Sequence, residues 1–154
     1  MVLKSLEHIF GDKPVRDEEI NYLLQNAISE ERCKIFILKD SDRIEEIKSA
    51  VQDGHEWISN ASVVLIFCSS KPTMDAMMKT NMIGMGIGFR AESMGLQATR
   101  ASMFGSRQFD RNKILEALNQ NESVGEGICP LVVVAIGHPV ERGMPPDTSN
   151  WQMS

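Results

Sequence analysis

The sequence predicts a single domain of the α+β class. Several short apolar runs are typical of buried strands, and the segments between them carry apolar residues at helical spacing. No internal repeat and no linker divides the chain, and 154 residues suit one domain with a substantial core. We therefore expect one domain over residues 1–154. Residues 143–154 form a polar, proline-containing tail that is either disordered or laid across a partner subunit.

The first third of the chain predicts a turn, a helix, a strand and a second helix. Gly and Pro place a turn within Phe10–Val15, and Asp17 can cap the helix that follows. The charged residues around Lys34–Leu38 bound a short apolar strand. Ser41 or Asp42 then opens the second helix. The inward-facing residues are expected to be Ile20, Leu23, Leu24 and Ala27 in the first helix, and Ile44, Ile47 and Val51 in the second.

The rest of the chain predicts three more strands and a further short helix. Val63–Cys68 is apolar throughout, which is typical of a central strand covered on both faces. Gln97–Phe104 is a weaker strand candidate, and Leu131–Ile136 is a strong one that ends at Gly137–Pro139. Between them Asp110 caps a helix whose apolar residues are Ile114, Leu115 and Leu118.

The stretch Thr73–Leu96 predicts one long helix. Its first residue is a suitable N-cap, Asp75 places a negative charge in the first turn, and Gly95 is a natural C-terminal stop. Apolar residues lie nearly all round this helix, which is typical of a buried helix. Lys79 and Arg90 interrupt the apolar run, so it is shorter than the roughly 20 residues that a membrane span needs.

Small residues form a stripe along this helix. Each glycine inside a helix costs about 1 kcal/mol relative to alanine, so the close approach of another group must offset that cost. The stripe indicates either tight packing, in a core or a dimer seam, or a face that lines a cofactor pocket. With the apolar surface it favours an obligate homodimer built on the helix. The stripe is Gly84, Gly88, Ala91 and Gly95, with Asn81 at one end, and the opposite side carries Met78, Met82, Met85 and Phe89.

Charge and cysteine content exclude several classes of function. The net charge of −5 and the absence of a basic block argue against nucleic acid as a partner. The three cysteines, Cys33, Cys68 and Cys129, are far apart and form no Cys-x-x-Cys pair, so we expect no metal site. The first residues contain no long apolar run, so no secretory signal and no membrane anchor are expected. Together these features predict a cytoplasmic protein.

Several local phrases, in order, resemble the nitroreductase family of flavin-dependent oxidoreductases. Phe10-x-x-x-Pro14-Val15 resembles the family's opening, and Lys34–Asp40 resembles its first central strand. Trp57–Cys68 is similar to its second strand with the preceding helix end. Ala91–Leu96 resembles the end of its long central helix, and Leu131–Pro139 its last core strand with a Gly-x-Pro turn.

This resemblance implies a nitroreductase-like fold, with a mostly antiparallel sheet flanked by helices and a long, buried central helix. It also implies a homodimer with FMN at the subunit interface. NAD(P)H reduces the flavin in such enzymes, and the flavin reduces a small acceptor such as a nitroaromatic or a quinone. Because the flavin carries the chemistry, no catalytic side chain is expected.

The residues that the family uses for flavin binding differ here. Counting back from Phe10, the family's Arg-x-Ser-x-Arg opening reads Lys4, Leu6 and His8. Lys4 keeps a charge without the bidentate fork, Leu6 lacks the hydroxyl, and His8 is only partly charged near neutral pH. These three positions either retain phosphate binding or are ordinary surface residues. Arg142 follows the last strand, where the family often has a second phosphate-binding cation, or it is a solvated tail residue.

Two further departures concern the flavin ring. The family's Gly-Leu-Gly reads Gly95-Leu96-Gln97, where Gln97 narrows the approach to a ligand. The loop that contacts the ring between the first helix and the first strand is reduced to Ser29–Cys33. The sequence therefore predicts an FMN-dependent oxidoreductase of the nitroreductase type, with Lys4, Leu6, His8, Gly95, Gln97 and Arg142 as cofactor-binding positions. The alternative is a degenerate member with weak or absent flavin binding that acts as a ligand-binding or interaction module.

Overall fold

The computed structural model describes residues 10–11, 13–25, 33–51, 58, 60–71, 73–104, 109–118 and 128–140. Helices and strands alternate along this part of the chain. In order they are α2 (Asp17–Leu24), β1 (Cys33–Leu38), α3 (Ser41–Ser49), β2 (Val63–Ser69), α4 (Met74–Ser93), β3 (Gln97–Ser102), α5 (Arg111–Ala117) and β4 (Cys129–Gly137). Two predictions fall outside the described residues: the inward-facing position of Ala27 in the first helix, and the polar tail over residues 143–154.

The four strands form one antiparallel sheet in the order β1-β2-β4-β3. The two middle strands, β2 and β4, are the most apolar in the sequence, and every residue of β2 is buried. The predicted strands are therefore confirmed, including the weaker candidate β3, which ends at Ser102 rather than Phe104. β3 lies at one edge of this sheet, and most of its side chains are only half-buried.

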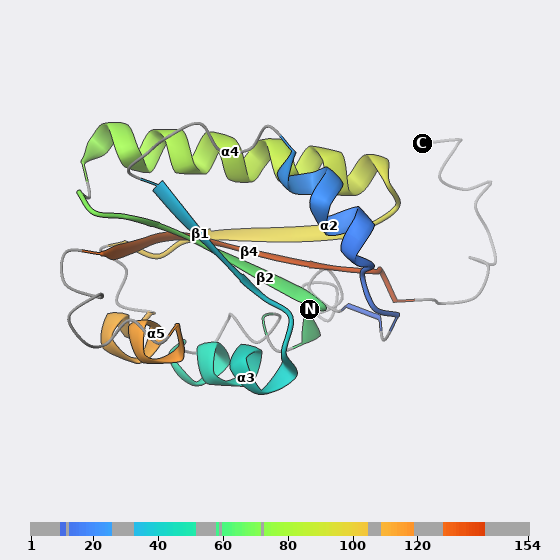
Figure 1. The fold of residues 1–154 in the computed structure, drawn as a ribbon, viewed down its shortest axis with the longest axis horizontal. Coiled ribbons are helices and arrows are strands. Elements are labelled where there is room, and N and C mark those ends of the chain that lie inside the picture. Colours follow the sequence, from blue (N-terminus) through green and yellow to red (C-terminus); the bar gives the residue numbers. More distant parts are fainter. Residues whose placement is uncertain are drawn as a thin grey trace, which may run out of the picture.

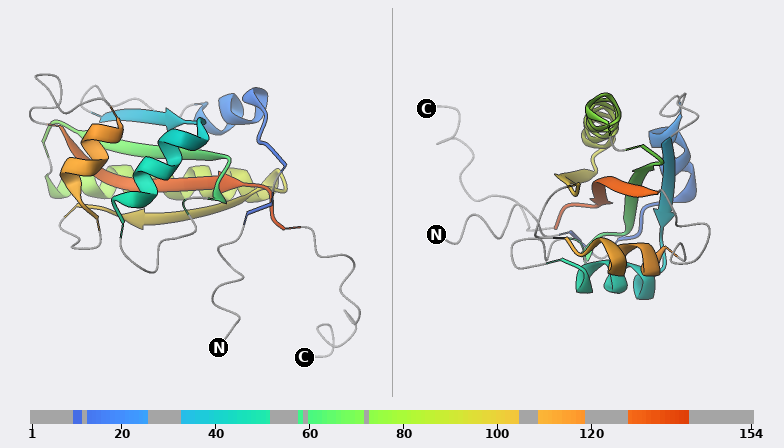
Figure 2. Two further views of the ribbon diagram at one scale, coloured as in Figure 1. Left: turned by 90° about the horizontal axis from the view of Figure 1, so that it is seen from below. Right: turned by 90° about the vertical axis from the view of Figure 1, so that its left-hand side faces the viewer.

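Helices cover both faces of the sheet, so the molecule has three layers. α4 and α2 lie on one face, and α3 and α5 lie on the other (Figures 1 and 2). Successive side chains of β2 point to opposite faces, which divides the core in two. Val63, Leu65 and Phe67 join the core under α4, while Val64, Ile66 and Cys68 join the core under α3 and α5.

Side-chain caps begin α3, α4 and α5, whereas the residue before α2 makes no such cap. The Thr73 hydroxyl accepts from the Ala76 N–H at 3.1 Å, and Asp110 accepts from two N–H groups at the start of α5, as predicted. Asp17 was the wrong cap for α2, because Arg16 precedes the helix and Asp17 lies in its first turn. α3 begins at Ser41, one of the two predicted first residues, and its cap is Asp40, whose side chain accepts from the Asp42 N–H at 3.0 Å.

The long helix α4 is buried on one side within this chain. Its buried residues are Thr80, Gly84, Ile87 and Ala91, which face the sheet. The predicted C-terminal stop is confirmed, since Gly95 has φ +81°, a conformation that glycine adopts without strain. None of the helices in the described part of the chain is long and apolar enough to cross a membrane.

Candidate functional site

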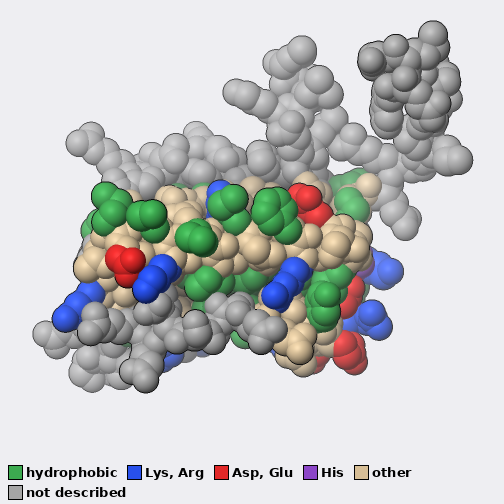
Figure 3. Space-filling model, turned by 90° about the horizontal axis from the view of Figure 1, so that it is seen from above, with side chains coloured by type: hydrophobic (Ala, Val, Ile, Leu, Met, Phe, Trp, Pro, Cys, Tyr) green, Lys and Arg blue, Asp and Glu red, His purple; other side chains and the backbone are tan. Residues whose placement is uncertain are grey.

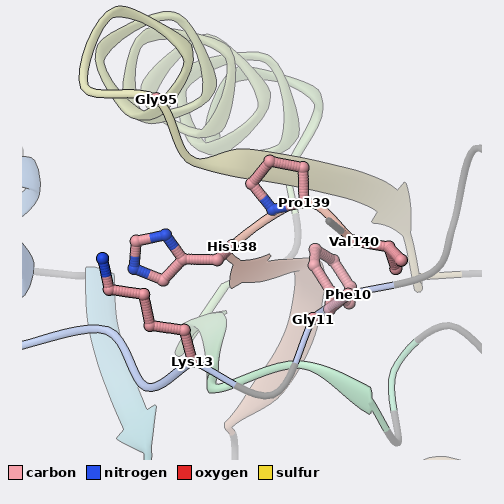
Figure 4. A pocket seen from close by; sticks show the side chains of 7 residues that line it. All are labelled: Phe10, Gly11, Lys13, Gly95, His138, Pro139 and Val140. Carbon is pink, nitrogen blue, oxygen red and sulfur yellow. The ribbon is translucent and has the colours of Figure 1, made fainter. Parts of the chain in front are cut away.

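A cavity of about 580 Å³ lies where the chain's first described residues meet the turn after β4. The C-terminal end of α4 closes one side of it through Gly95 (Figure 4). The lining residues are Phe10, Gly11, Lys13, Gly95, His138, Pro139 and Val140.

Backbone contacts between two distant segments form the floor of this cavity. Phe10 makes an isolated antiparallel bridge with Pro139, and the Gly11 N–H donates to the His138 carbonyl at 2.6 Å. The glycines permit this approach. A Cβ atom on Gly11 would lie 2.9 Å from the Pro139 carbonyl oxygen, and one on Gly137 would lie 2.7 Å from the Phe10 ring. The Gly-x-Pro turn after β4 thus fixes the position of His138.

Two basic side chains extend toward one side of the cavity, those of Lys13 and His138 (Figure 4). The His138 ring is half-buried, and its Nε2 atom is buried without a hydrogen-bond partner in the described part of the chain. An unsatisfied buried polar atom is costly, and it calls for a partner. Lys13 is exposed, and among the described residues its ammonium group makes no ion pair.

Glu19, at the start of α2, is the acidic group nearest in its electrostatics to this cavity, because His138 is one of the groups that lower the pKa of its carboxyl. Its Oε1 accepts from the Arg16 backbone N–H at 3.0 Å and from the Arg16 Nε at 3.3 Å. The backbone hydrogen bond is the main reason that the pKa of the Glu19 carboxyl lies below its ordinary value, and the Arg16 guanidinium and His138 lower the pKa further. Glu19 is thus held by Arg16 and does not line the cavity.

A second hollow, a groove of about 480 Å³, runs between α4 and the edge strand β3. Gly84 makes the closest contact between these elements, because its Cβ position lies 3.1 Å from the Arg100 Cδ and 3.4 Å from the Val134 Cγ2. The Arg100 guanidinium donates to the Asn81 carbonyl at 3.1 Å across the groove. The residues of the small-residue stripe therefore have different surroundings. Gly84 packs against the sheet, while Gly88 lines the open groove.

A row of exposed apolar side chains runs along the outer side of α4 (Figure 3). The exposed fractions are 70% for Met74, 59% for Met78, 67% for Met82, 45% for Met85 and 66% for Phe89. We call these five residues the α4 stripe. Monomeric proteins rarely expose a large contiguous apolar patch, and such a patch marks an interaction surface.

The predicted cofactor-binding residues are only partly within the described structure. Gly95 lines the cavity and Gln97 lines the groove, so the structure places them in two different hollows. Lys4, Leu6, His8 and Arg142 lie outside the described residues.

Sequence reasoning overlooked Lys13 and His138. A signal was available, because each lies beside a proline in a turn, and His138 directly follows an apolar strand. The residues that the structure describes contain no cluster of His, Cys, Asp or Glu side chains that could hold a metal ion.

No protein-family model and no curated protein sequence matches the chain. Solved structures do match it. An FMN-dependent nitroreductase from Clostridium difficile R20291 is 15% identical with a TM-score of 0.75, and the alignment covers 97% of this chain and 94% of that one.

Two further structures give the same result. A putative NADH dehydrogenase/NAD(P)H nitroreductase from Parabacteroides distasonis is 18% identical with a TM-score of 0.72, over 99% of this chain and 95% of that one. An NADPH:FMN oxidoreductase from Vibrio harveyi, solved in complex with NAD⁺, is 19% identical with a TM-score of 0.67, over 94% and 73% of the two chains. The expectation from the sequence phrases is confirmed at the level of architecture: the chain has the nitroreductase fold.

Proposed function

We propose that this protein binds FMN and transfers hydride from NAD(P)H, through the flavin, to a small acceptor such as a nitroaromatic or a quinone. The observation that carries the proposal is the likeness, over nearly the whole chain, to structures described as FMN-dependent or NAD(P)H-dependent reductases. Bound flavin would supply the hydride-accepting chemistry. The protein would hold the cofactor and orient it, and none of its side chains is assigned a catalytic role.

The described residues fit a ligand that carries an anionic phosphate. His138 and Lys13 line the same cavity, and an imidazole and an ammonium group can both donate hydrogen bonds to an oxyanion. Lys4 is proposed as the main cation for the flavin phosphate, with His8 and Arg142 assisting. Because Lys4 and His8 stand where the family has arginines and lack the guanidinium fork, we expect weak FMN binding. Each lost charged hydrogen bond removes about 1.5–3 kcal/mol, or about tenfold or more in affinity.

A titration of the purified protein with FMN and with riboflavin tests this proposal. We expect the protein to become yellow with added FMN and to bind riboflavin, which lacks the phosphate, less tightly. Lys4→Ala should weaken FMN binding and leave riboflavin binding unchanged. Equal weakening of both ligands, or of neither, would show that the phosphate is held elsewhere.

We further propose that the α4 stripe is the seam of a homodimer. Its side chains are apolar and exposed, and they lie beside a groove that the same chain leaves open. Burying them against a second copy of α4 would remove this apolar surface from water, which favours association.

Sedimentation of Met82→Glu tests the dimer seam. A buried charge without a partner opposes association, so this variant should sediment as a monomer. Tyr22→Glu is the matched control, because Tyr22 is 52% exposed but lies on α2. The Tyr22 variant should remain a dimer. A stable monomer of the unmutated protein would refute the dimer.

One observation favours the alternative, a nitroreductase-fold protein that binds flavin poorly and acts as a ligand-binding or interaction module. Only residues 25–32 separate α2 from β1, so the family's ring-contacting loop has no room there. Titration followed by mixing with NADH or NADPH separates the two functions, since the alternative predicts a dimer that binds FMN weakly or not at all and does not accelerate its reduction.

A further inference from the structure

We propose that the four methionines of the α4 stripe are an oxidation site, and that their conversion to methionine sulfoxide dissociates the homodimer. The inference rests on the dimer seam proposed above, and it does not depend on flavin binding. The methionines are Met74, Met78, Met82 and Met85.

Exposure in a single chain distinguishes these four methionines from the others that the structure describes. The four residues are 45–70% exposed and lie along one side of α4 (Figure 3). Met77 and Met94 are half-buried and pack against the core under α4, while Met103 is buried in the core under α3 and α5. An oxidant that arrives from solvent therefore reaches the thioethers of the stripe first.

The spacing of the four methionines joins them into one surface. They follow one another at intervals of three or four residues, and side chains at this spacing are neighbours on a helix. Oxidation of several of them would therefore change a continuous apolar surface into a polar one, rather than alter isolated positions.

A peroxide is the class of oxidant that this site requires. The thioether sulfur attacks one oxygen of hydrogen peroxide, the O–O bond breaks and an S–O bond forms. The sulfur loses two electrons, and the second oxygen leaves as water with both peroxide protons. The product, methionine sulfoxide, is polar where the thioether was apolar.

Oxidation opposes the dimer without disturbing the fold of one chain. In the described part of the chain no stripe residue belongs to either core, because α4 packs on the sheet through its opposite side. A sulfoxide oxygen stays hydrated in the monomer, whereas against the apolar stripe of a second copy it loses its water without gaining a donor. Only the dimer bears this cost. We expect each sulfoxide to weaken association about tenfold or more, as an unsatisfied buried polar group does.

The seam also controls access to the site. In the dimer each stripe covers the other, so the oxidant acts on the dissociated chain. An oxidised chain cannot associate again, and the dimer is then lost by mass action. The dimer should therefore be oxidised more slowly at high protein concentration than at low protein concentration.

Sedimentation of the full-length protein before and after hydrogen peroxide treatment tests the inference. Peptide mass spectrometry locates the added oxygens, and circular dichroism follows the helix content. We expect oxidation of the stripe before that of Met77, Met94 or Met103, an unchanged helix signal, and conversion of the dimer to a monomer. A methionine sulfoxide reductase should restore the dimer, because it returns the sulfoxide to the thioether.

Leucine variants separate the stripe from the other methionines. Leucine keeps the apolar surface at a similar volume and has no sulfur, so a variant with leucine at all four stripe methionines should remain a dimer after peroxide treatment. Met94→Leu is the matched control, since it removes a methionine at the end of α4 outside the stripe. This control should dissociate as the unmutated protein does.

The inference is overturned if the dimer persists with its stripe oxidised, or if the four-leucine variant dissociates as readily as the unmutated protein. A monomer before any treatment would refute the dimer seam, and this inference with it. The FMN titration decides the proposed cofactor function independently, because it does not depend on the state of the stripe.

Discussion

Replacing Gly84 by leucine should separate α4 from the sheet, and the structure gives the size of the effect. The new Cβ would lie 3.1 Å from the Arg100 Cδ, 3.4 Å from the Val134 Cγ2 and 3.7 Å from the Val132 Cγ1, and leucine adds three more carbons in the same direction. Overpacking of this kind costs about 1–3 kcal/mol. Three added carbons place the cost at the upper end of this range, and removing a glycine from a helix returns up to about 1 kcal/mol, so the net loss is about 2 kcal/mol.

Gly86→Leu is the matched control for this prediction. Gly86 lies in the same helix, and nothing lies within 4 Å of its Cβ position. Its replacement should therefore gain the free energy of removing a glycine from a helix without the cost of overpacking. Thermal unfolding at one fixed protein concentration compares the two variants. A domain of this size loses about 2–4 °C in Tm per kcal/mol, so Gly84→Leu should unfold about 4–8 °C below the unmutated protein. Gly86→Leu should unfold at the same temperature as the unmutated protein or higher. If Gly84→Leu were as stable as Gly86→Leu, the close packing of α4 on β4 would be wrong.

Three further predictions concern the ends of helices and the turn after β4. Asp110→Ala removes the N-cap of α5 and should lower the free energy of unfolding in urea by about 1 kcal/mol; an unchanged midpoint would contradict the cap. Glu19 has a lowered pKa in the folded protein, so it stabilises the fold above its ordinary pKa, and this stabilisation is lost as the pH falls through the lowered value. Glu19→Gln should therefore be less stable than the unmutated protein at neutral pH and equally stable in acid, and a constant difference across pH would refute the assignment. Phe10 is buried against Gly137, so Phe10→Ala should cost about 3–5 kcal/mol, and a loss below 1 kcal/mol would show that the ring is not part of the core.

The local features of this fold could be predicted because they depend on local chemistry. An apolar run such as Val63–Cys68 is stable as a strand only where both of its faces are covered, in the middle of a sheet, and the structure has it there. Thr73 and Asp110 were predicted as caps because their side chains accept from N–H groups two or three residues further along the chain. The error at α2 is of one residue, since Arg16 precedes the helix and the predicted cap, Asp17, is its first residue.

The sheet order and the site required contacts between distant segments. Nothing in the spacing of the strands places β4 between β2 and β3, since this order depends on pairing across the whole chain. The cavity depends on the same long-range contacts, because Lys13 and His138 meet only when Phe10 pairs with Pro139. The sequence left a core and a dimer seam as alternatives for the apolar surface of the long helix, because exposure depends on what the rest of the chain covers, and one chain leaves the α4 stripe exposed.

Anaerobic mixing of the FMN-loaded protein with NADH or NADPH tests the central claim most directly. The flavin's visible absorbance is followed after mixing, and the same FMN concentration without protein is the reference. We expect the protein to accelerate reduction of the flavin by at least one of the two nucleotides, and the acceleration to saturate as FMN fills the protein. Reduction at the rate of free FMN, with both nucleotides and at full FMN occupancy, would contradict the proposed oxidoreductase function.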